Sequence, residues 1–223
     1  MKSPYKKISC ENMDDVLGNL GITKVKYTSE LLVNWLTIEE GNENTLTPTQ
    51  SVIFQDVLEM MNANVEGWNE EELKIKALSL IFYIAKMEDV PRIKMFFERP
   101  IHAIVDSFLI DVKVDCMLAT PWGQATPQHP YFFLQEFKQE KKKSLDPEAQ
   151  MLAAMVAAQE INKNGKPLFG GYIIGRNWFF GVLEGKTYTI SNAFNATEEP
   201  DLRKIIFILR RLKQIILTAL ITD

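Results

Sequence analysis

The length, composition and charge of the chain are those of an ordinary globular protein. Of its 223 residues, 46% are hydrophobic and 24% are charged, which is enough for one substantial domain with a buried core, or for one domain with an extension. The formal net charge is −4, so the surface as a whole does not indicate nucleic-acid binding, although a local basic groove is compatible with this charge.

Cysteine and histidine are too scarce to build a disulfide framework or a histidine-rich metal centre. The chain has two residues of each type. Cys10 and Cys116 are far apart in the sequence, and Cys116 lies in a predicted core strand. Neither their number nor their spacing indicates a disulfide framework or a zinc site.

The two ends of the sequence indicate neither export nor a membrane span. The first ten residues, MKSPYKKISC, are polar and lack the apolar core of a signal peptide. The longest apolar tract near the other end is interrupted by Arg210, Arg211 and Lys213, which a membrane-spanning helix would not carry. We therefore expect a cytoplasmic protein without a membrane partner.

Residues 1–65 are predicted to form a helical extension packed on a main domain of residues 66–223. Residues 13–20 are expected to form a short helix that ends at Gly21, and residues 31–38 read as a helix or a strand. Between residues 48 and 62, apolar side chains recur at the spacing of an amphipathic helix.

The main domain is predicted to begin with a largely buried helix. Asn69 is a suitable N-cap, and the three glutamates that follow it favour the positive end of a helix dipole. Apolar residues from Leu73 to Ile84 then occupy much of the helix circumference. This pattern is typical of a helix covered on most sides.

Strands are predicted after this helix. Residues 93–110 alternate as one extended strand, or as a pair interrupted at Pro100; Glu98 is expected at an edge or on the surface. Residues 109–111 are interpreted as a turn that leads into a strand at 112–118. The three prolines and one glycine of residues 120–130 predict a loop.

The remaining elements are a helix, three strands and a final helix. Asp146 and Pro147 are a favourable start for a helix with a small-residue face. Strands are expected at 167–174, 178–183 and 187–190, and a last helix from about residue 198 to about residue 220, whose apolar positions form one stripe.

Acidic and basic residues stand inside two of the predicted core strands. Asp115 lies in the apolar run 112–118, and the sequence Glu136-Phe137-Lys138 ends the apolar run that begins at residue 131. Because side chains alternate along a strand, Glu136 and Lys138 are expected to point the same way. Buried charges need partners or water, since burying an unpaired charge is costly.

An Asp on one strand, Glu-x-Lys on the next and Gln150 on the following helix resemble the PD-(D/E)XK superfamily of nucleases. The segments PYFFLQEFK, DPEAQMLAAMVAAQ, GRNWFFGVLEGKTY and RKIIFILRRLK are similar to those of a group of small bacterial proteins in this superfamily. The sequence departs from the family name at Val114, where the name has proline. The resemblance covers roughly residues 69–215.

The resemblance implies an α/β fold with a restriction-endonuclease-like core. This core has the order α-β-β-β-α-β, with a mixed central sheet flanked by helices, and here it would carry extra N-terminal helices and a C-terminal helix. Residues 69–175 can be read in that order.

The resemblance also implies roles for individual residues. Asp115 and Glu136 would bind Mg²⁺ or Mn²⁺, because hard oxygen ligands suit such ions. Lys138 would stabilise the transition state or orient the attacking water. Gln150 would steady Lys138 or the water from the helix.

Other acidic residues compete for a place in this site. Asp111 has the same strand parity as Asp115, and Asp115 is preferred because apolar residues flank it on both sides. Superfamily members often add a glutamate from the helix before the first core strand. Glu72 is the first candidate for that position and Glu71 the second, while a capping role for these glutamates is an equal alternative.

Three basic residues are candidates for substrate binding. Lys141 and Lys142, in a cluster with Lys143, follow the Glu-x-Lys strand and are suited to hold a phosphate backbone. Arg176, in a predicted turn, is a further candidate to assist substrate binding. The alternative for all of them is a solvated loop position.

These observations favour a magnesium-dependent endo- or exodeoxyribonuclease that hydrolyses phosphodiester bonds, with DNA as partner. The alternative is a catalytically inactive module that keeps the fold and binds nucleic acid or a protein. An enzyme of different chemistry that shares only the carboxylate–lysine arrangement is a third hypothesis. Binding of Mg²⁺ or Mn²⁺ through Asp115 and Glu136 separates the first hypothesis from the second.

Overall fold

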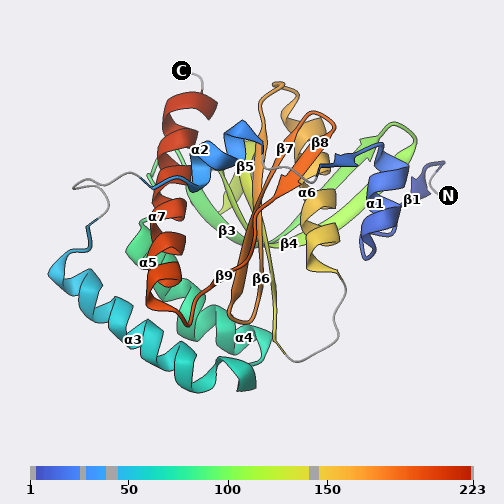
Figure 1. Ribbon diagram of the computed structural model, residues 1–223. Coiled ribbons are helices and arrows are strands. Elements are labelled where there is room, and N and C mark those ends of the chain that lie inside the picture. Colours follow the sequence, from blue (N-terminus) through green and yellow to red (C-terminus); the bar gives the residue numbers. More distant parts are fainter. Residues whose placement is uncertain (1–3, 26–28, 39–44, 141–145, 222–223) are drawn as a thin grey trace.

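A mixed β-sheet runs through the centre of the protein, with helices on both of its faces (Figure 1). The computed structural model describes residues 4–25, 29–38, 45–140 and 146–221. Within these residues the sheet has nine strands, and none of the helices is long and apolar enough to cross a membrane. The predicted α/β class with a mixed central sheet is confirmed.

Seven strands form a continuous path across the sheet. In spatial order they are β1 (Lys6–Lys7), β4 (Phe108–Trp122), β5 (Thr126–Lys138), β6 (Leu168–Ile174), β7 (Asn177–Glu184), β8 (Thr187–Ile190) and β2 (Thr23–Lys24). Strand β3 (Lys94–Val105) pairs with β4, and β9 (Phe194–Asn195) pairs with β7. Parallel pairing of β5 with β6 beside antiparallel pairing of β4 with β5 makes the sheet mixed.

The helices lie in two layers, one on each face of the sheet (Figure 1). One layer contains α2 (Glu30–Leu36), α3 (Pro48–Asn64), α4 (Glu70–Leu73), α5 (Ser79–Ala85) and α7 (Glu199–Ile215). The other contains α1 (Met13–Leu20) and α6 (Pro147–Asn162). A 3₁₀ turn, η2 (Val65–Gly67), and two π-helical segments, η3 (Lys74–Leu78) and η4 (Ile216–Leu220), complete the structure. Two hydrophobic cores separate the sheet from these layers.

Trp35 on α2 connects the N-terminal region to the central sheet. Its side chain is fully buried, and its ring makes edge-on contacts with Phe133, Phe169 and Phe180. Its Nε1–H donates a hydrogen bond to the carbonyl oxygen of Ile208 on α7. Residues on both sides of the predicted boundary at 65 thus share one core, and the division into extension and main domain stays a prediction.

The predicted order of one helix, three strands, a helix and a strand is observed between residues 70 and 174. Segments α4, η3 and α5 are continuous and precede β3, β4, β5, α6 and β6 in the chain. Asn69 caps the start of α4 as predicted: its Oδ1 accepts from Glu72 N–H while the Glu72 carboxylate accepts from Asn69 N–H. This reciprocal pair is a capping box, which fixes where the helix begins.

The strands around the motif are longer than predicted. The turn between β3 and β4 lies at Asp106 and Ser107 rather than at 109–111, which belong to β4. Asp106 has a φ of 54°, a left-handed conformation that aspartate tolerates better than most residues. The predicted loop at 120–130 consists of the ends of β4 and β5 around a short turn at Gly123. Pro100 does not interrupt β3, because β3 pairs on one side only and needs no second row of N–H donors.

Candidate active site

Asp115 lies where strands β4 and β5 separate. The pairing between these strands runs from Trp122 opposite Thr126 to Cys116 opposite Gln135. One residue beyond that last pair, Asp115 Oδ2 accepts a hydrogen bond of 2.8 Å from the backbone N–H of Phe137. The carboxylate therefore takes the place of a backbone partner for β5, and this bond fixes its position in a nearly buried setting.

Glu136 and Lys138 lie beside Asp115 on the neighbouring strand. The Lys138 ammonium is 3.8 Å from Glu136 Oε2 and 4.0 Å from Asp115 Oδ2, so the two residues share one side of β5, as strand alternation predicts. Glu136 is only 3% exposed. Two carboxylates and one amine thus meet at the point where the strands diverge.

The first turns of the helix over 70–85 contribute two more charged side chains to this site, next to Asp115 and Lys138. Glu70 Oε2 is 4.0 Å from the Lys138 ammonium, and Lys74 Nζ is 3.3 Å from Asp115 Oδ1. We define the carboxylate–lysine cluster as the seven residues joined by these and the neighbouring ion pairs: Glu70, Glu71, Lys74, Glu98, Asp115, Glu136 and Lys138.

Burial and like charge dominate the electrostatics of the cluster. Burial, and next the negative charge of Asp115, raise the pKa of the Glu136 carboxyl well above its ordinary value, because both disfavour its ionised form. At the rim the effect is opposite. Hydrogen bonds from Lys113 and then Lys74 lower the pKa of Glu98 to about 2. Positive charge therefore offsets the negative charge of Glu136, in the interior of the cluster, less fully than that of Glu98, at its rim.

Glu72, the predicted glutamate from the helix, forms no hydrogen bond or ion pair with the cluster within the described part of the chain. Its carboxylate accepts from Asn69 N–H and from Lys76 Nζ at 2.7 Å, and these bonds, that with Lys76 foremost, lower its pKa. The capping alternative describes this geometry. Glu70, two residues earlier, contacts Lys138 instead.

Gln150 lies in the first turns of α6, and its side chain makes no hydrogen bond to the cluster within the described residues. Its Oε1 is buried and has no partner in the part of the chain that the structure describes. An orphaned buried acceptor is costly unless a donor or water reaches it. The role predicted for Gln150 stays a prediction.

The basic residues predicted to bind substrate have different outcomes. Lys141 and Lys142 lie outside the described residues. Arg176, in the turn between β6 and β7, donates from Nε to Glu140 at 3.0 Å and from an Nη to Glu66 at 2.8 Å. Its guanidinium is thus engaged by two carboxylates, and substrate contact would have to compete with both.

The competing aspartate, Asp111, lies apart from the cluster. It pairs with Lys7 at 2.6 Å and with His102 Nδ1 at 2.8 Å, and its side chain is 37% exposed. The preference for Asp115 rested on flanking apolar residues, and the buried position of Asp115 agrees with that reasoning.

Sequence reasoning missed three members of the cluster: Glu70, Lys74 and Glu98. Glu98 was placed at an edge or on the surface, and it is indeed on the edge strand β3 and 45% exposed at the side chain. Its φ of 55° interrupts the alternation of β3, and no local pattern announces this. Lys74 stands one turn after Glu70 and Glu71, at helical spacings that could have suggested mutual ion pairs.

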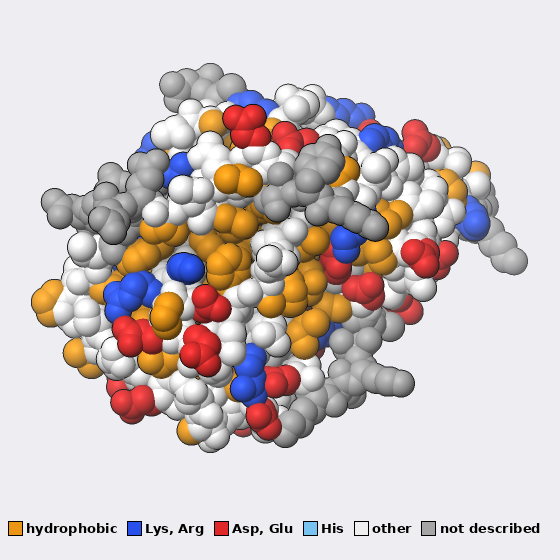
Figure 2. All heavy atoms as spheres, in the orientation of Figure 1, with side chains coloured by type: hydrophobic (Ala, Val, Ile, Leu, Met, Phe, Trp, Pro, Cys, Tyr) orange, Lys and Arg blue, Asp and Glu red, His pale blue; other side chains and the backbone are white. Residues whose placement is uncertain are grey.

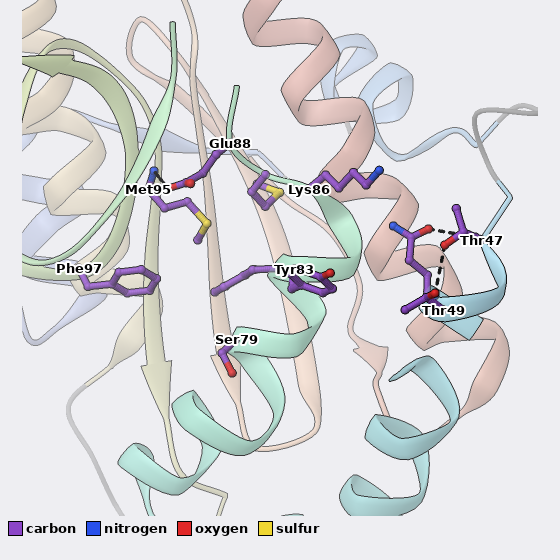
Figure 3. A pocket seen from close by; sticks show the side chains of 11 residues that line it. Thr47, Thr49, Ser79, Tyr83, Lys86, Glu88, Met95 and Phe97 are labelled. Carbon is purple, nitrogen blue, oxygen red and sulfur yellow. Dashed lines mark hydrogen bonds between the residues drawn. The ribbon is translucent and has the colours of Figure 1, made fainter. Parts of the chain in front are cut away.

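A pocket lies farther along the same helix, between α5, β3 and the start of α3. Its volume is about 610 Å³. Figure 3 shows Phe97 reaching from β3, Tyr83 and Ser79 on α5, and Thr47 and Thr49 at the beginning of α3. None of the residues predicted for the active site lines it. The pocket therefore neighbours the cluster through Phe97 and Glu98 but is a separate feature.

The surface drawn in Figure 2 carries acidic and basic side chains interspersed with apolar ones. This distribution agrees with the modest net charge of −4.

A scan against protein-family models found no matching family, and a search of curated proteins found no matching relative.

Proposed function

We propose that this protein is a restriction-endonuclease-like nuclease that hydrolyses phosphodiester bonds in DNA with the help of Mg²⁺ or Mn²⁺. The observation that supports the proposal most is the meeting of buried Asp115, Glu136 and Lys138 at the divergence of two core strands. The chain order of helix, three strands, helix and strand around them agrees with that fold.

The two buried carboxylates suit a divalent metal ion. Asp115 and Glu136 lie within 4.0 Å of the same ammonium group, and the charge of Asp115 contributes to the raised pKa of Glu136. A cation with hard-ligand preference relieves that repulsion. Mg²⁺ typically takes one or two carboxylates and keeps several waters, so the donor set fits. A bound ion of this kind lowers the pKa of water and stabilises charge on a phosphate.

The chain itself supplies positioning and positive charge. The Phe137 N–H fixes Asp115, and the strand geometry fixes Glu136 two residues from Lys138. The Lys138 side chain is 14% exposed, so its charge acts in a setting less screened than water. In the proposed reaction the Lys138 ammonium stabilises the negative charge that develops on the phosphate.

A second candidate function is a non-catalytic module with the same fold. Lys74 favours it, because its ammonium already contacts Asp115 at 3.3 Å and supplies part of the charge that a metal would bring. Such a module would bind nucleic acid or a protein without needing a divalent ion.

Cleavage of linear, circular and single-stranded DNA in Mg²⁺ or Mn²⁺ tests the proposal. Wild type is expected to cleave at least one form, and Lys138→Ala to lose the activity by about a hundredfold or more. Lys163→Ala is the matched control, since Lys163 is exposed and forms its ion pair with Glu160, away from the cluster. Absence of cleavage with either metal, in a protein that is folded, would favour the binding module.

A further inference from the structure

Lys74 lies inside the carboxylate–lysine cluster and contacts three different structural elements. Its ammonium meets carboxylates from α4, β3 and β4, and its side chain is only 16% exposed. The distances from Nζ are 2.9 Å to Glu98, 3.3 Å to Glu71, 3.3 Å to Asp115 and 3.5 Å to Glu70. One ammonium group thus links the helix to both strands of the β3–β4 hairpin.

This spacing suits an ammonium ion and is too wide for magnesium. Oxygen ligands lie about 2.0–2.1 Å from Mg²⁺, whereas the carboxylate oxygens around Lys74 lie 2.9–3.5 Å from its nitrogen. Within the described residues, no group of three or more Asp, Glu, His or Cys is arranged to hold a metal ion. Asp115 and the helix glutamates instead surround the Lys74 nitrogen at 3.3–3.5 Å.

The cluster carries a net negative charge that a divalent cation would offset more than an ammonium group does. Its five carboxylates face Lys74 and Lys138, and Lys113 pairs with Glu98 from outside. Each carboxylate has an ammonium partner, but five carboxylates and three ammonium groups leave a formal net charge of −2 when all are ionised. A divalent ion carries twice the charge of the Lys74 ammonium and approaches oxygen more closely, so its attraction to Asp115 is stronger at equal burial.

Lys74 also has a route out of the buried part of the cluster. Two of its partners are at the surface, since the Glu71 side chain is 73% exposed and that of Glu98 is 45% exposed. A lysine ammonium on its flexible stem can keep these outer pairs while leaving Asp115. Lys74 further begins the π-helical segment η3, and π-helical turns inside α-helices occur frequently at functional sites.

We propose that Lys74 is an internal counter-cation that a divalent metal ion displaces from Asp115. Without metal, Lys74 offsets part of the negative charge around Asp115. With metal, Asp115 turns its Oδ1 from Lys74 to the ion, and Lys74 stays with Glu71 and Glu98. The inference rests on the proposed function for the identity of the metal site and adds that metal binding is opposed by a residue of the same chain.

Calorimetric titration of Mn²⁺ into wild type, Lys74→Met and Lys76→Met tests this displacement. In Lys74→Met the ion no longer has to break the Lys74–Asp115 contact. Mn²⁺ is therefore expected to bind the variant about tenfold more tightly than wild type, or more. Lys76→Met removes the same charge from the same helix, but Lys76 pairs with Glu72 outside the cluster, so its affinity is expected to stay within about twofold of wild type. Adding Asp115→Asn to Lys74→Met is expected to abolish the gain.

Each outcome of this titration has a distinct meaning. Equal affinity of wild type and Lys74→Met would overturn the displacement and leave the nuclease proposal intact. Equal tightening in Lys74→Met and Lys76→Met would also overturn it, because net charge alone would then explain the effect. Absence of Mn²⁺ binding in all three proteins would overturn both the metal site and the role of Lys74.

A measurement on wild type keeps the proposal testable if Lys74→Met does not fold. The ε-methylene signals of lysine report the environment of the ammonium group in ¹³C-resolved NMR spectra. Titration with Mg²⁺ is expected to shift the Lys74 signal and to leave that of Lys76 in place. A Lys74 signal unchanged at saturating Mg²⁺ would overturn the displacement.

Discussion

Glu98, at the rim of the cluster, is kept ionised by two neighbouring lysines. Its carboxylate pairs with Lys113 and, at 2.9 Å, with Lys74. Hydrogen bonds from these two lysines lower its pKa from 4.5 to about 2. A carboxyl whose pKa is lower in the folded than in the unfolded state stabilises the fold above its unfolded pKa, and that contribution is lost as the pH falls toward the folded value.

Glu98→Gln is therefore expected to reduce the pH dependence of stability in acid. The wild-type free energy of unfolding should fall between about pH 4.5 and about pH 2 more steeply than that of the variant. Because the side chain is 45% exposed, salt should weaken the difference. Urea unfolding at several pH values measures it, and parallel curves for the two proteins would contradict the assignment.

At the scale of elements, the site depends on where the helix over 70–85 begins. The capping box between Asn69 and Glu72 fixes the first turn, and that turn carries Glu70 toward Lys138 and Lys74 toward Asp115. The cap was predicted from the residue types alone, because its chemistry is local. The partners of the helix were not predicted, because they come from separate strands: Glu98 and Asp115 follow Lys74 by 24 and 41 residues.

Asn69→Ala tests the contribution of this cap. Loss of the side-chain acceptor is expected to lower the free energy of unfolding by about 1 kcal/mol, and Asn69→Asp to restore most of it. Urea denaturation measures both variants. If Asn69→Ala were as stable as wild type, the helix start would be fixed by tertiary packing rather than by its cap.

Predictions were accurate where a structure depends on neighbouring residues in the sequence, and less accurate where it depends on tertiary contacts. Helices with clear caps and strands with continuous apolar runs were found close to their observed bounds, as for α1 and β6. The turn at Asp106 was misplaced because its left-handed residue is not glycine. Glu98 and Lys74 were not assigned to the site, because tertiary structure brings them to Asp115: the pairing of β3 with β4 for Glu98, and the packing of the helix against the sheet for Lys74.

At the scale of the whole molecule, Trp35 ties the N-terminal region to the sheet and to α7. It is fully buried among aromatic rings and donates to Ile208 O. Its removal leaves a large cavity and removes the hydrogen bond to Ile208 on α7. The N-terminal helices are therefore expected to be part of the cooperative fold rather than an independent attachment.

Trp35→Ala is expected to lower the free energy of unfolding by about 3–5 kcal/mol. Trp122→Ala is the matched control, because Trp122 is 68% exposed and its loss should change stability by about 0.5 kcal/mol or less. Thermal and urea unfolding measure both variants. A small effect of Trp35→Ala would mean that α2 is not essential to the core.

In the proposed nuclease, Asp115 and not another acidic residue of β4 serves the metal site. The most direct measurement is the single-turnover rate of DNA cleavage in saturating Mn²⁺ by Asp115→Asn and Asp111→Asn. Both variants remove one aspartate charge from the same strand, but Asp111 pairs with Lys7 and His102 away from the cluster.

We expect Asp115→Asn to lose about a hundredfold or more of the wild-type rate, comparable to the loss of one electrostatic contact to a transition state. Asp111→Asn should cleave within about twofold of wild type, because a surface ion pair contributes little. The reverse pattern, with Asp115→Asn active and Asp111→Asn inactive, would contradict the proposed site.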